Sequence, residues 1–470
     1  MNDFTHNISR TPGRRTGGLI LNAFVMDYGH HESAWRAARA KPSDSVSLDH
    51  YADIAARAEA AAFDAIFFAD IPAVTGSVEK RAADALDPIL LLAAIAARTE
   101  RIGLIATAST TYSEPFTLAR AFATLDHISN GRAGWNMVTT SSPAAAGNFG
   151  AAEFPAPEDR YRRGREFLDV ANALWDSWAD DAIVGDHSGG VFADADKVRP
   201  IDHAGDHFAV SGPLNVRRSP QGRPVQVQAG SSDPGIDIAG EYADAVFTAQ
   251  REAGGGLEFA ERVRAAAQRH GRAPDSVKIL PGIVPVIRDS EAEALRAVDD
   301  LDDLIVTRHA VASLASVIGV DPELIDLDRP LPWDVIGDPA KFRGKVSRAD
   351  LILTLAHEGN LTARQVIRRL GGGRGHNIVA GTAEQVADYV TDWYRIGAAD
   401  GFNVMPPVYD TEFQPFIDGV LPILRERGLF RTAYSGATLR DHYGLARPPA
   451  RFGGDATAGE NTDGGKEAAA

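Results

Sequence analysis

The sequence predicts a parallel (β/α)8 barrel, the TIM-barrel fold, with two insertions. Short apolar runs alternate with helical segments along most of the 470 residues. The apolar runs are nearly continuous rather than alternating, which is typical of parallel strands that are covered on both faces. Eight such runs occur, and this number favours a closed barrel over an open doubly wound sheet.

The predicted strands and helices follow one another in order. The strands are expected at residues 19–24, 65–70, 102–109, 133–140, 225–230, 245–249, 278–287 and 401–405. Apolar periodicity places helices between them, at about 50–62, 88–98, 115–129, 160–178, 236–243, 257–270 and 416–428. Ser290 and Thr382 each begin a capping box, S/T-x-x-E/Q, which marks two further helix starts.

Two segments exceed what a barrel needs, so we expect insertions at about 182–223 and 307–380. The first is rich in Gly, Asp and His and irregular, whereas the second has a helical pattern. We therefore predict a single barrel domain over 19–430, a flexible N-terminus at 1–18, and a C-terminal extension over 431–470. The last twenty residues are small, polar and glycine-rich, which predicts a disordered tail.

The composition excludes several classes of protein. The chain has no cysteine, so it has no disulfide framework, thiolate–zinc site or cysteine nucleophile. Its 48 Lys+Arg against 64 Asp+Glu give a formal net charge of -16, a poor electrostatic match to nucleic acid or anionic membranes. No signal peptide or membrane-length apolar run is visible, which predicts a cytoplasmic protein.

Polar residues at the strand ends are the first functional candidates, because barrel active sites form at the carboxyl ends of the strands. Four strands end this way: Asp70 in FFAD, Thr107 in IATAST, Asn136–Ser142 in WNMVTTSS, and Ser231-Ser232 in QAGSS. Capping of the next helix is an equally good explanation for each residue taken alone. The Gly-Ser-Ser of QAGSS, just before a helix, has the hydroxyls and amides of a phosphate cradle.

The histidines allow structural and functional interpretations. His203 and His207 have HxxxH spacing but lie outside a helix, so a hairpin is favoured over a metal site, and no metal is expected. His30 and His31 follow the first strand, where barrel chemistry is located, and His376 lies in GGGRGHN. No GxGxxG, GxxxxGK[ST] or GxSxG motif is present.

These segments together resemble the bacterial-luciferase-like flavin monooxygenases, in the subgroup typified by nitrilotriacetate monooxygenase component A and dibenzothiophene-sulfone monooxygenase. The resemblance rests on segments in family order between residues 21 and 388. They are LNAF…GHHESAWR (21–36), FFAD (67–70), TASTTYSEPFTLARAFATLDHISNGRAGWNMVTT (107–140), NFG (148–150), EDRYRRGREFLDVANALWDSW (158–178), GPLNVRRSPQGRPVQVQAGSS (212–232) and GHNIVAGTAEQVAD (375–388).

The resemblance implies a luciferase-like barrel that uses reduced FMN and O2 through a flavin hydroperoxide. A separate NAD(P)H:flavin reductase would supply the reduced flavin, which fits the missing dinucleotide motif. By motif, Asp70, Thr107 and Asn136 would line the flavin ring and ribityl chain, and Tyr161, Ser231 and Ser232 would bind towards the phosphate. The family commonly has histidine four residues before that tyrosine, and this chain has Pro157 there.

The expected substrate pocket is framed by Phe24, His31, Phe68 and Ser141, with His376 as a contact from a lid. His31 and His376 are the candidate catalytic residues, and ordinary packing or an inert histidine remain the alternatives. The phenylalanines favour an aromatic or organosulfur substrate, with cleavage of a C–S, C–N or C–halogen bond. A deazaflavin-dependent oxidoreductase and a non-catalytic flavin-binding relative are the alternative functions. The resemblance also implies a homodimer or homotetramer.

Overall fold

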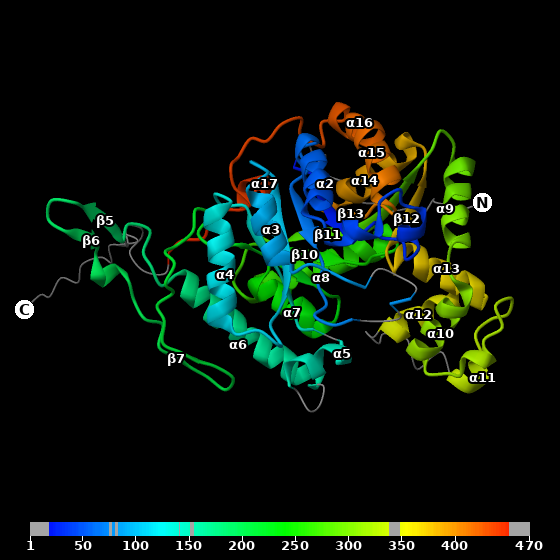
Figure 1. Cartoon of the computed structure of the whole chain (residues 1–470), viewed down its shortest axis with the longest axis horizontal. Helices are drawn as coiled ribbons and strands as arrows, with labels where there is room; N and C mark the ends of the chain where they lie inside the picture. Colours follow the sequence, from blue (N-terminus) through cyan, green and yellow to red (C-terminus); the bar gives the residue numbers. More distant parts are fainter. Residues whose placement is uncertain are drawn as a thin grey trace, which may run out of the picture.

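The computed structural model describes residues 18–74, 78–79, 83–140, 142–150, 155–337 and 348–450. Eight parallel strands close into a barrel in the order β1-β2-β3-β4-β9-β10-β11-β13, with β13 pairing back to β1. β1 lies between two neighbours, with Ala23 opposite Ile66 of β2 and Val404 of β13. The predicted (β/α)8 barrel is confirmed, and all eight predicted strands form it (Figure 1).

The predicted strands and helices lie close to the expected residues, and the loops and insertions add further elements. The strands are β1 Ile20–Val25, β2 Ala65–Phe68, β3 Gly103–Ser109, β4 Ala133–Val138, β5 Ile183–Asp186, β6 Val191–Ala193, β7 His203–Ala204, β8 Ala209–Val210, β9 Val225–Ala229, β10 Ala245–Thr248, β11 Lys278–Ile287, β12 Asn377–Gly381 and β13 Gly401–Val404. The helices are α1 Ala34–Ala37, α2 Leu48–Ala60, α3 Pro88–Ala96, α4 Pro115–Ile128, α5 Pro143–Ala146, α6 Pro157–Trp175, α7 Asp233–Tyr242, α8 Ala253–Arg269, α9 Glu291–Asp303, α10 Thr307–Ile318, α11 Trp333–Ile336, α12 Arg348–Glu358, α13 Ala363–Gly373, α14 Ala383–Ile396, α15 Tyr409–Pro415, α16 Leu421–Glu426 and α17 Leu439–Tyr443. Thr382 makes the predicted capping box with Gln385, and Ser290 accepts a hydrogen bond from the Glu293 amide.

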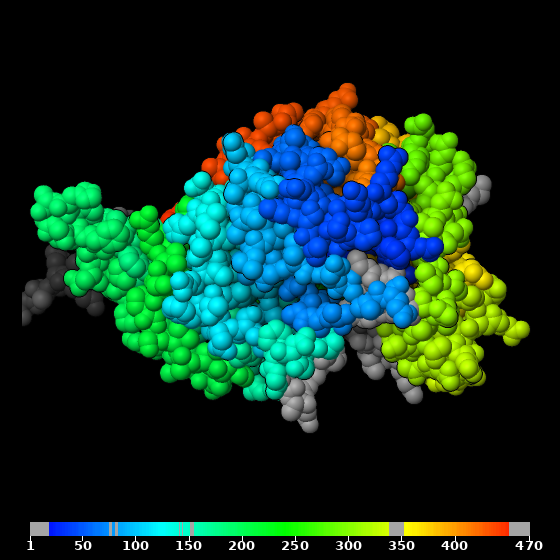
Figure 2. Space-filling model, viewed as in Figure 1, coloured from blue at the N-terminus to red at the C-terminus, as the bar shows by residue number. Residues whose placement is uncertain are grey.

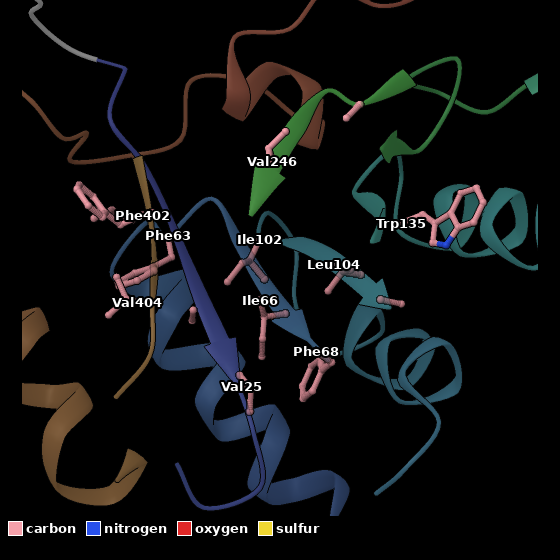
Figure 3. Close-up of a cluster of buried hydrophobic side chains, with 14 of the residues drawn as sticks. Val25, Phe63, Ile66, Phe68, Ile102, Leu104, Trp135, Val246, Phe402 and Val404 are labelled. Carbon is pink, nitrogen blue, oxygen red and sulfur yellow. The ribbon is translucent and has the colours of Figure 1, made fainter. Parts of the chain in front are cut away.

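Two apolar layers hold the barrel, one on each face of its strands. Side chains such as Ile66, Leu104 and Trp135 point outward and pack against the surrounding helices (Figure 3). Phe24 and Phe67 belong to the smaller cluster of residues inside the barrel. Because neighbouring residues on a strand point to opposite faces, both faces of each strand are apolar, which explains the continuous apolar runs of the sequence.

The two long connections carry additional structure, at opposite ends of the molecule (Figures 1 and 2). Between α6 and β9 the chain forms two antiparallel hairpins, β5–β6 and β7–β8. Between α9 and β12 the described residues form α10, α11, α12 and α13, which share a small apolar core of their own. β12 was not predicted; it extends the sheet by pairing in parallel with the second half of β11.

The C-terminal segment closes the amino-terminal end of the barrel. Leu439 and Tyr443 of α17 are buried in the interior cluster, and Leu439 contacts the strands at Gly103 and Gly134. Arg440 donates hydrogen bonds to both carboxylate oxygens of Asp244. The first part of the predicted C-terminal extension is therefore a plug, whereas the predicted tail and flexible N-terminus lie almost entirely outside the described residues. Among the helices of the described chain, none has the length and apolar character to cross a membrane.

Candidate active site

The carboxyl ends of β3 and β4 present a connected pair of buried polar side chains. The amide Nδ2 of Asn136 donates to Oγ1 of Thr107 at 2.8 Å, and that hydroxyl donates to the Phe68 carbonyl oxygen at 2.8 Å. Oδ1 of Asn136 is buried and has no hydrogen-bond partner in the structure. A buried acceptor without a donor is costly, so this atom is available to a donor on a bound molecule.

Asp70 lies just beyond β2, at the same end of the barrel, and its side chain is partly exposed. Burial raises the pKa of its carboxyl to about 6, and the nearby charge of Asp87 adds to the effect. A backbone hydrogen bond at Ile71 offsets only part of this shift, and a further hydrogen-bond donor from a ligand would stabilise the charged form of the carboxylate.

Tyr161 and Ser232 meet at the carboxyl end of β9. Their hydroxyl oxygens are 2.8 Å apart, and Ser232 caps α7 by accepting from the Gly235 amide at 3.2 Å. Ser231 is exposed beside them, and Oε1 of the buried Gln228 has no hydrogen-bond partner among the described residues. Pro234 has no N–H and the Gly235 amide already donates to Ser232, so these two positions of the predicted cradle offer no free amide to a phosphate.

Pro157 is the first residue of α6, one turn before Tyr161. Proline suits this position because the first amide of a helix has no partner within the helix and the fixed φ of proline is already helical. The substitution at the position where the resemblance expects histidine therefore preserves the helix that carries Tyr161, while it removes a polar side chain.

The two candidate catalytic histidines occupy different environments. His376 lies over the interior of the barrel, where its ring stacks on Phe247 with centroids 5.1 Å apart and an interplanar angle of 4°. His31 is buried away from that stack: its Nδ1 accepts from the Ser33 amide at 3.0 Å and its Nε2 lies 3.1 Å from Oδ1 of Asp302. Both ring nitrogens of His31 are thus engaged within the protein.

His30, which we did not select from the sequence, lies beside His376 instead. Their ring centroids are 5.7 Å apart, and the His30 ring also meets Phe24 edge-on at 6.3 Å. Nε2 of His30 is 3.2 Å from the Gly373 carbonyl oxygen, which fixes the proton on Nε2. The buried Nδ1 is then an acceptor that has no partner within the described part of the chain. Burial, helped by the positive charge of Arg374, holds the pKa of His30 well below its usual value, so the ring is neutral.

The predicted substrate-pocket residues are only partly brought together. Phe24 lies inside the barrel against Phe67 and Phe247, with ring centroids 5.0 and 5.2 Å away. Phe68 points to the other face, where it packs edge-on against Tyr51 of α2. Ser141 lies outside the described residues. Phe67, the neighbour of Phe68, is the phenylalanine that points inward.

Two other features bear on the expected chemistry. His203 and His207 belong to the β7–β8 hairpin, where Glu166 accepts from the His207 amide and lies 3.0 Å from Nε2 of His203, as a structural hairpin predicts. In the described part of the chain, no group of three His, Asp or Glu residues could hold a metal ion. A separate cavity of about 430 Å³ opens beside α6, with Tyr112 and Phe149 in its wall, and contains none of the predicted site residues.

Comparison with known proteins places this barrel in a family. Residues 29–400 match the family model for luciferase-like monooxygenases. The chain belongs to the luciferase-like monooxygenase family. It is 43% identical over 433 residues to nitrilotriacetate monooxygenase component A of Aminobacter aminovorans, covering 89% of this chain and 95% of that one. It is 38% identical over 430 residues to dibenzothiophene-sulfone monooxygenase of Rhodococcus erythropolis, with coverage of 89% and 94%.

A solved structure supports the same assignment. Riboflavin lyase, in a structure with modified FMN and riboflavin, superposes with a TM-score of 0.80 at 32% identity, covering 92% of this chain and 97% of that one. The predicted family, its subgroup and the barrel are confirmed, and this luciferase-like protein is a monooxygenase. Dependence on flavin and O2 fits the family.

Proposed function

We propose that this luciferase-like monooxygenase is the oxygenase of a two-component system that uses reduced FMN and O2. The observation that supports this most directly is the buried Asn136–Thr107 pair with its unpartnered Oδ1, located at the same end of the barrel as the Tyr161–Ser232 pair. Amide, hydroxyl and carboxylate groups in this arrangement match a ligand that has ring N–H groups, a polyol chain and a phosphate.

In this proposal the strand ends bind the cofactor. Asp70, Thr107 and Asn136 hold the flavin ring and ribityl chain, while Tyr161, Ser231 and Ser232 bind towards the phosphate. Reduced FMN, when bound, supplies the electrons for O2 activation. The protein contributes orientation, hydrogen bonds and exclusion of water.

The substrate side of the site is formed by Phe24, Phe247 and the two histidines His30 and His376. Aromatic rings and the neutral imidazole of His30 favour an organic substrate with a substantial apolar part, and we keep an aromatic or organosulfur compound as the first class to test. The outcome would be cleavage of a C–S, C–N or C–halogen bond. The names of the two relatives include an aminocarboxylate and an aromatic sulfone, so they do not select one of these bonds.

A separate NAD(P)H:flavin reductase belongs to the proposal because no nucleotide-binding motif is present for NAD(P)H in this sequence. The name of the Aminobacter relative, component A, is consistent with such a partner. We also expect a homodimer or homotetramer, which light scattering on the purified protein would reveal.

The proposal is tested by binding and by turnover. Purified protein is titrated with FMN and, separately, with riboflavin, which has no phosphate. Ser232→Ala is expected to weaken FMN binding about tenfold, the value of one good hydrogen bond to a charged group, and to leave riboflavin binding unchanged. Ser290→Ala is the matched control, because Ser290 caps α9 in the same way, at 3.3 Å from the Glu293 amide.

The turnover assay combines the protein with a generic flavin reductase, NADH, FMN and O2, and a panel of organosulfur, amine and haloaromatic compounds. Substrate-dependent loss of O2, with one oxygen atom found in the product by mass spectrometry, supports the proposal. If Ser232→Ala weakened the binding of FMN and of riboflavin equally, this result would contradict the proposed phosphate site. Reduction of a substrate without O2 consumption would contradict the monooxygenase reaction proposed for this site.

A further inference from the structure

The loop after β1 is attached to the helical segment between β11 and β12 by a buried side-chain pair. Nε2 of His31 and Oδ1 of Asp302 are 3.1 Å apart, and the two side chains are only 2% and 6% exposed. Nδ1 of His31 accepts from the Ser33 amide, so Nε2 is assigned as the nitrogen that donates. The contact is thus a hydrogen bond to a carboxylate.

Asp302 occupies a position that is otherwise unfavourable for a carboxylate. It lies in the last turn of α9, which contains no basic residue, so it sits at the negative end of the helix dipole. It is also buried, and a buried carboxylate needs hydrogen-bond partners. The hydrogen bond with His31 gives this buried carboxylate a partner.

The residues on either side of His31 make parallel contacts with the end of α13. The Glu32 amide donates to the Gly371 carbonyl oxygen at 3.1 Å, and Nε2 of His30 donates to the Gly373 carbonyl oxygen at 3.2 Å. Gly373 also accepts from the backbone amide of His376, at 2.8 Å. One carbonyl oxygen therefore links the two histidines that lie over the barrel.

The glycines of this turn permit the close approach. A Cβ on Gly371 would lie 2.6 Å from Cδ1 of Ile305, and one on Gly372 would lie 2.9 Å from Cδ1 of Ile378 and 3.6 Å from Cδ2 of His31. Three glycines at a helix end lower its intrinsic stability by about 1 kcal/mol each relative to alanine. Because these residues are buried and finish α13, the glycine-rich segment is packed in this structure, whereas the sequence suggested a lid.

We propose that Asp302 is a positioning residue, which acts through His31 to hold the His30 ring and the His376 turn over the barrel. The carboxylate fixes the rotation of the His31 ring, and His31 holds the loop whose neighbouring residues contact Gly371 and Gly373. This inference rests on the proposed function, in which His30 and His376 contact the substrate. It assigns to His31 a role different from the catalytic one predicted from the sequence.

The test measures how well His30 is protected from a histidine-modifying reagent. Full-length wild-type protein, Asp302→Ala and Asp302→Asn are treated with diethylpyrocarbonate, and each histidine is followed by peptide mass spectrometry. Exposed His187 serves as the internal reference. Asp302→Ala is expected to raise the labelling rate of His30 about tenfold, because a hydrogen bond to a charged group is lost. Asp302→Asn retains an oxygen acceptor and should keep His30 protected.

A second pair of variants separates positioning from general destabilisation. His31→Asn keeps an acceptor for the Ser33 amide but is too short to reach Asp302, so it should label like Asp302→Ala. The double variant should label no faster than either single variant, because both remove the same contact. Wild-type protection of His30 in Asp302→Ala and His31→Asn, whether or not the melting temperature falls, would overturn the proposal. Additive effects in the double variant would overturn it as well.

Failure of this inference and failure of the proposed function can be told apart. The labelling experiment uses neither flavin nor O2, so its result stands whatever the reaction is. Binding of oxidised FMN, measured by fluorescence quenching, should be unchanged in Asp302→Ala, because Asp302 lies outside the Tyr161–Ser232 cradle. Weakened FMN binding in that variant would show that Asp302 acts on the cofactor site and would overturn the assignment to the histidines.

Discussion

The hydroxyl of Tyr443 donates a hydrogen bond to Oδ1 of Asn22, 2.9 Å away, and so joins the C-terminal helix α17 to the first strand of the barrel. Nδ2 of Asn22 in turn donates to Oδ1 of Asn403 at 3.0 Å, and Nδ2 of Asn403 donates to the Leu280 carbonyl oxygen at 3.0 Å. All of these groups are buried, so the network connects three strands and the plug without solvent.

Removing the Tyr443 hydroxyl is expected to destabilise the protein while preserving its shape. Tyr443→Phe leaves Oδ1 of Asn22 buried without its donor, which should lower the free energy of unfolding by about 1–3 kcal/mol. Urea denaturation monitored by circular dichroism measures the change. An unaltered midpoint would contradict the role assigned to this hydrogen bond.

Truncation tests the plug as a whole. A chain ending at residue 430 loses Leu439 and Tyr443 from the interior cluster, and it should aggregate or unfold at low urea concentration. A chain ending at residue 450 keeps every contact described above and is the matched control. Equal stability of the two truncated chains would contradict a plug.

The stability of the plug should also depend on pH through His442. Its Nε2 lies 2.8 Å from the Arg101 carbonyl oxygen, and burial lowers the pKa of His442 to about 4 from 6.5. Since the folded protein binds this proton less readily than the unfolded chain, the contribution is complete above pH 6.5 and is lost as the pH falls towards 4. The loss should amount to about 3 kcal/mol.

His442→Gln is the matched variant for this prediction. Glutamine retains an N–H donor for the Arg101 carbonyl oxygen but does not titrate in this range. The difference in unfolding free energy between wild type and variant should therefore change between pH 7 and pH 4, while other groups titrate equally in both. A constant difference across this range would refute the assignment to His442.

The sequence predicted the barrel because its signal is repeated eight times, whereas single residues carried less information. Phe67 and Phe68 are adjacent, and both faces of a parallel strand are apolar, so no alternation indicated which ring points inward. The sequence likewise did not indicate which of His30 and His31 points over the barrel, because both lie in an irregular loop. The direction of each ring depends on its contact with Gly373 or Asp302, more than 270 residues away. Asp70, Thr107, Asn136 and Ser232 were identified as candidates because strand ends in a barrel converge on one face. Tyr161 lies in α6 and was identified only through the family resemblance.

Some short elements were not predicted from the sequence, although Thr438 and Asp441 form a capping box at the start of α17. β12 is five residues long and follows a glycine-rich turn, and it forms because β11 extends beyond the barrel and offers an edge. α17 is also five residues long, and its burial comes from contacts with strands that lie far away in the sequence. Long-range pairing of this kind is not encoded in local propensity.

The position of His376 should depend on the absence of a side chain at Gly282. A Cβ on Gly282 of β11 would lie 2.6 Å from both Nδ1 of His376 and Sδ of Met405. Gly282→Ala is therefore expected to displace the imidazole from its stack on Phe247 and to cost about 1–3 kcal/mol of stability. A crystal structure of the variant shows the displacement, and urea denaturation measures the cost.

Gly254→Ala is the control for this substitution. A Cβ at Gly254, in the first turn of α8, would meet nothing within 4 Å, so the change should leave stability unchanged or raise it by about 0.5–1 kcal/mol. In the turnover assay, Gly282→Ala should increase the share of consumed O2 that appears as H2O2, whereas Gly254→Ala should not. An unmoved His376 ring in Gly282→Ala would contradict this prediction.

Asp70 is expected to make cofactor binding depend on pH. The pKa of its carboxyl, raised from 3.8 to about 6 mainly by burial, means that the group is charged above pH 6 and able to accept hydrogen bonds from ring N–H groups. Binding of riboflavin should therefore weaken as the pH falls through 6. In Asp70→Asn, riboflavin binding should not depend on pH in this range. Riboflavin is used because it has no phosphate that titrates in the same range.

The same raised pKa has a consequence for stability, with a defined sign. The unfolded chain releases the Asp70 proton near pH 3.8, whereas the folded protein releases it near pH 6. Charging the carboxylate therefore lowers the stability of the folded protein. This loss is absent below pH 3.8 and complete above about pH 6. Asp70→Asn should raise the free energy of unfolding at pH 8, by at most about 3 kcal/mol and by less because solvent screens a partly exposed group. At pH 3.5 wild type and variant should be equally stable. Two results would show that Asp70 is held by protein contacts instead of being available to the flavin. One is an Asp70→Asn variant that is less stable than wild type at pH 8. The other is riboflavin binding to Asp70→Asn that still weakens as the pH falls through 6.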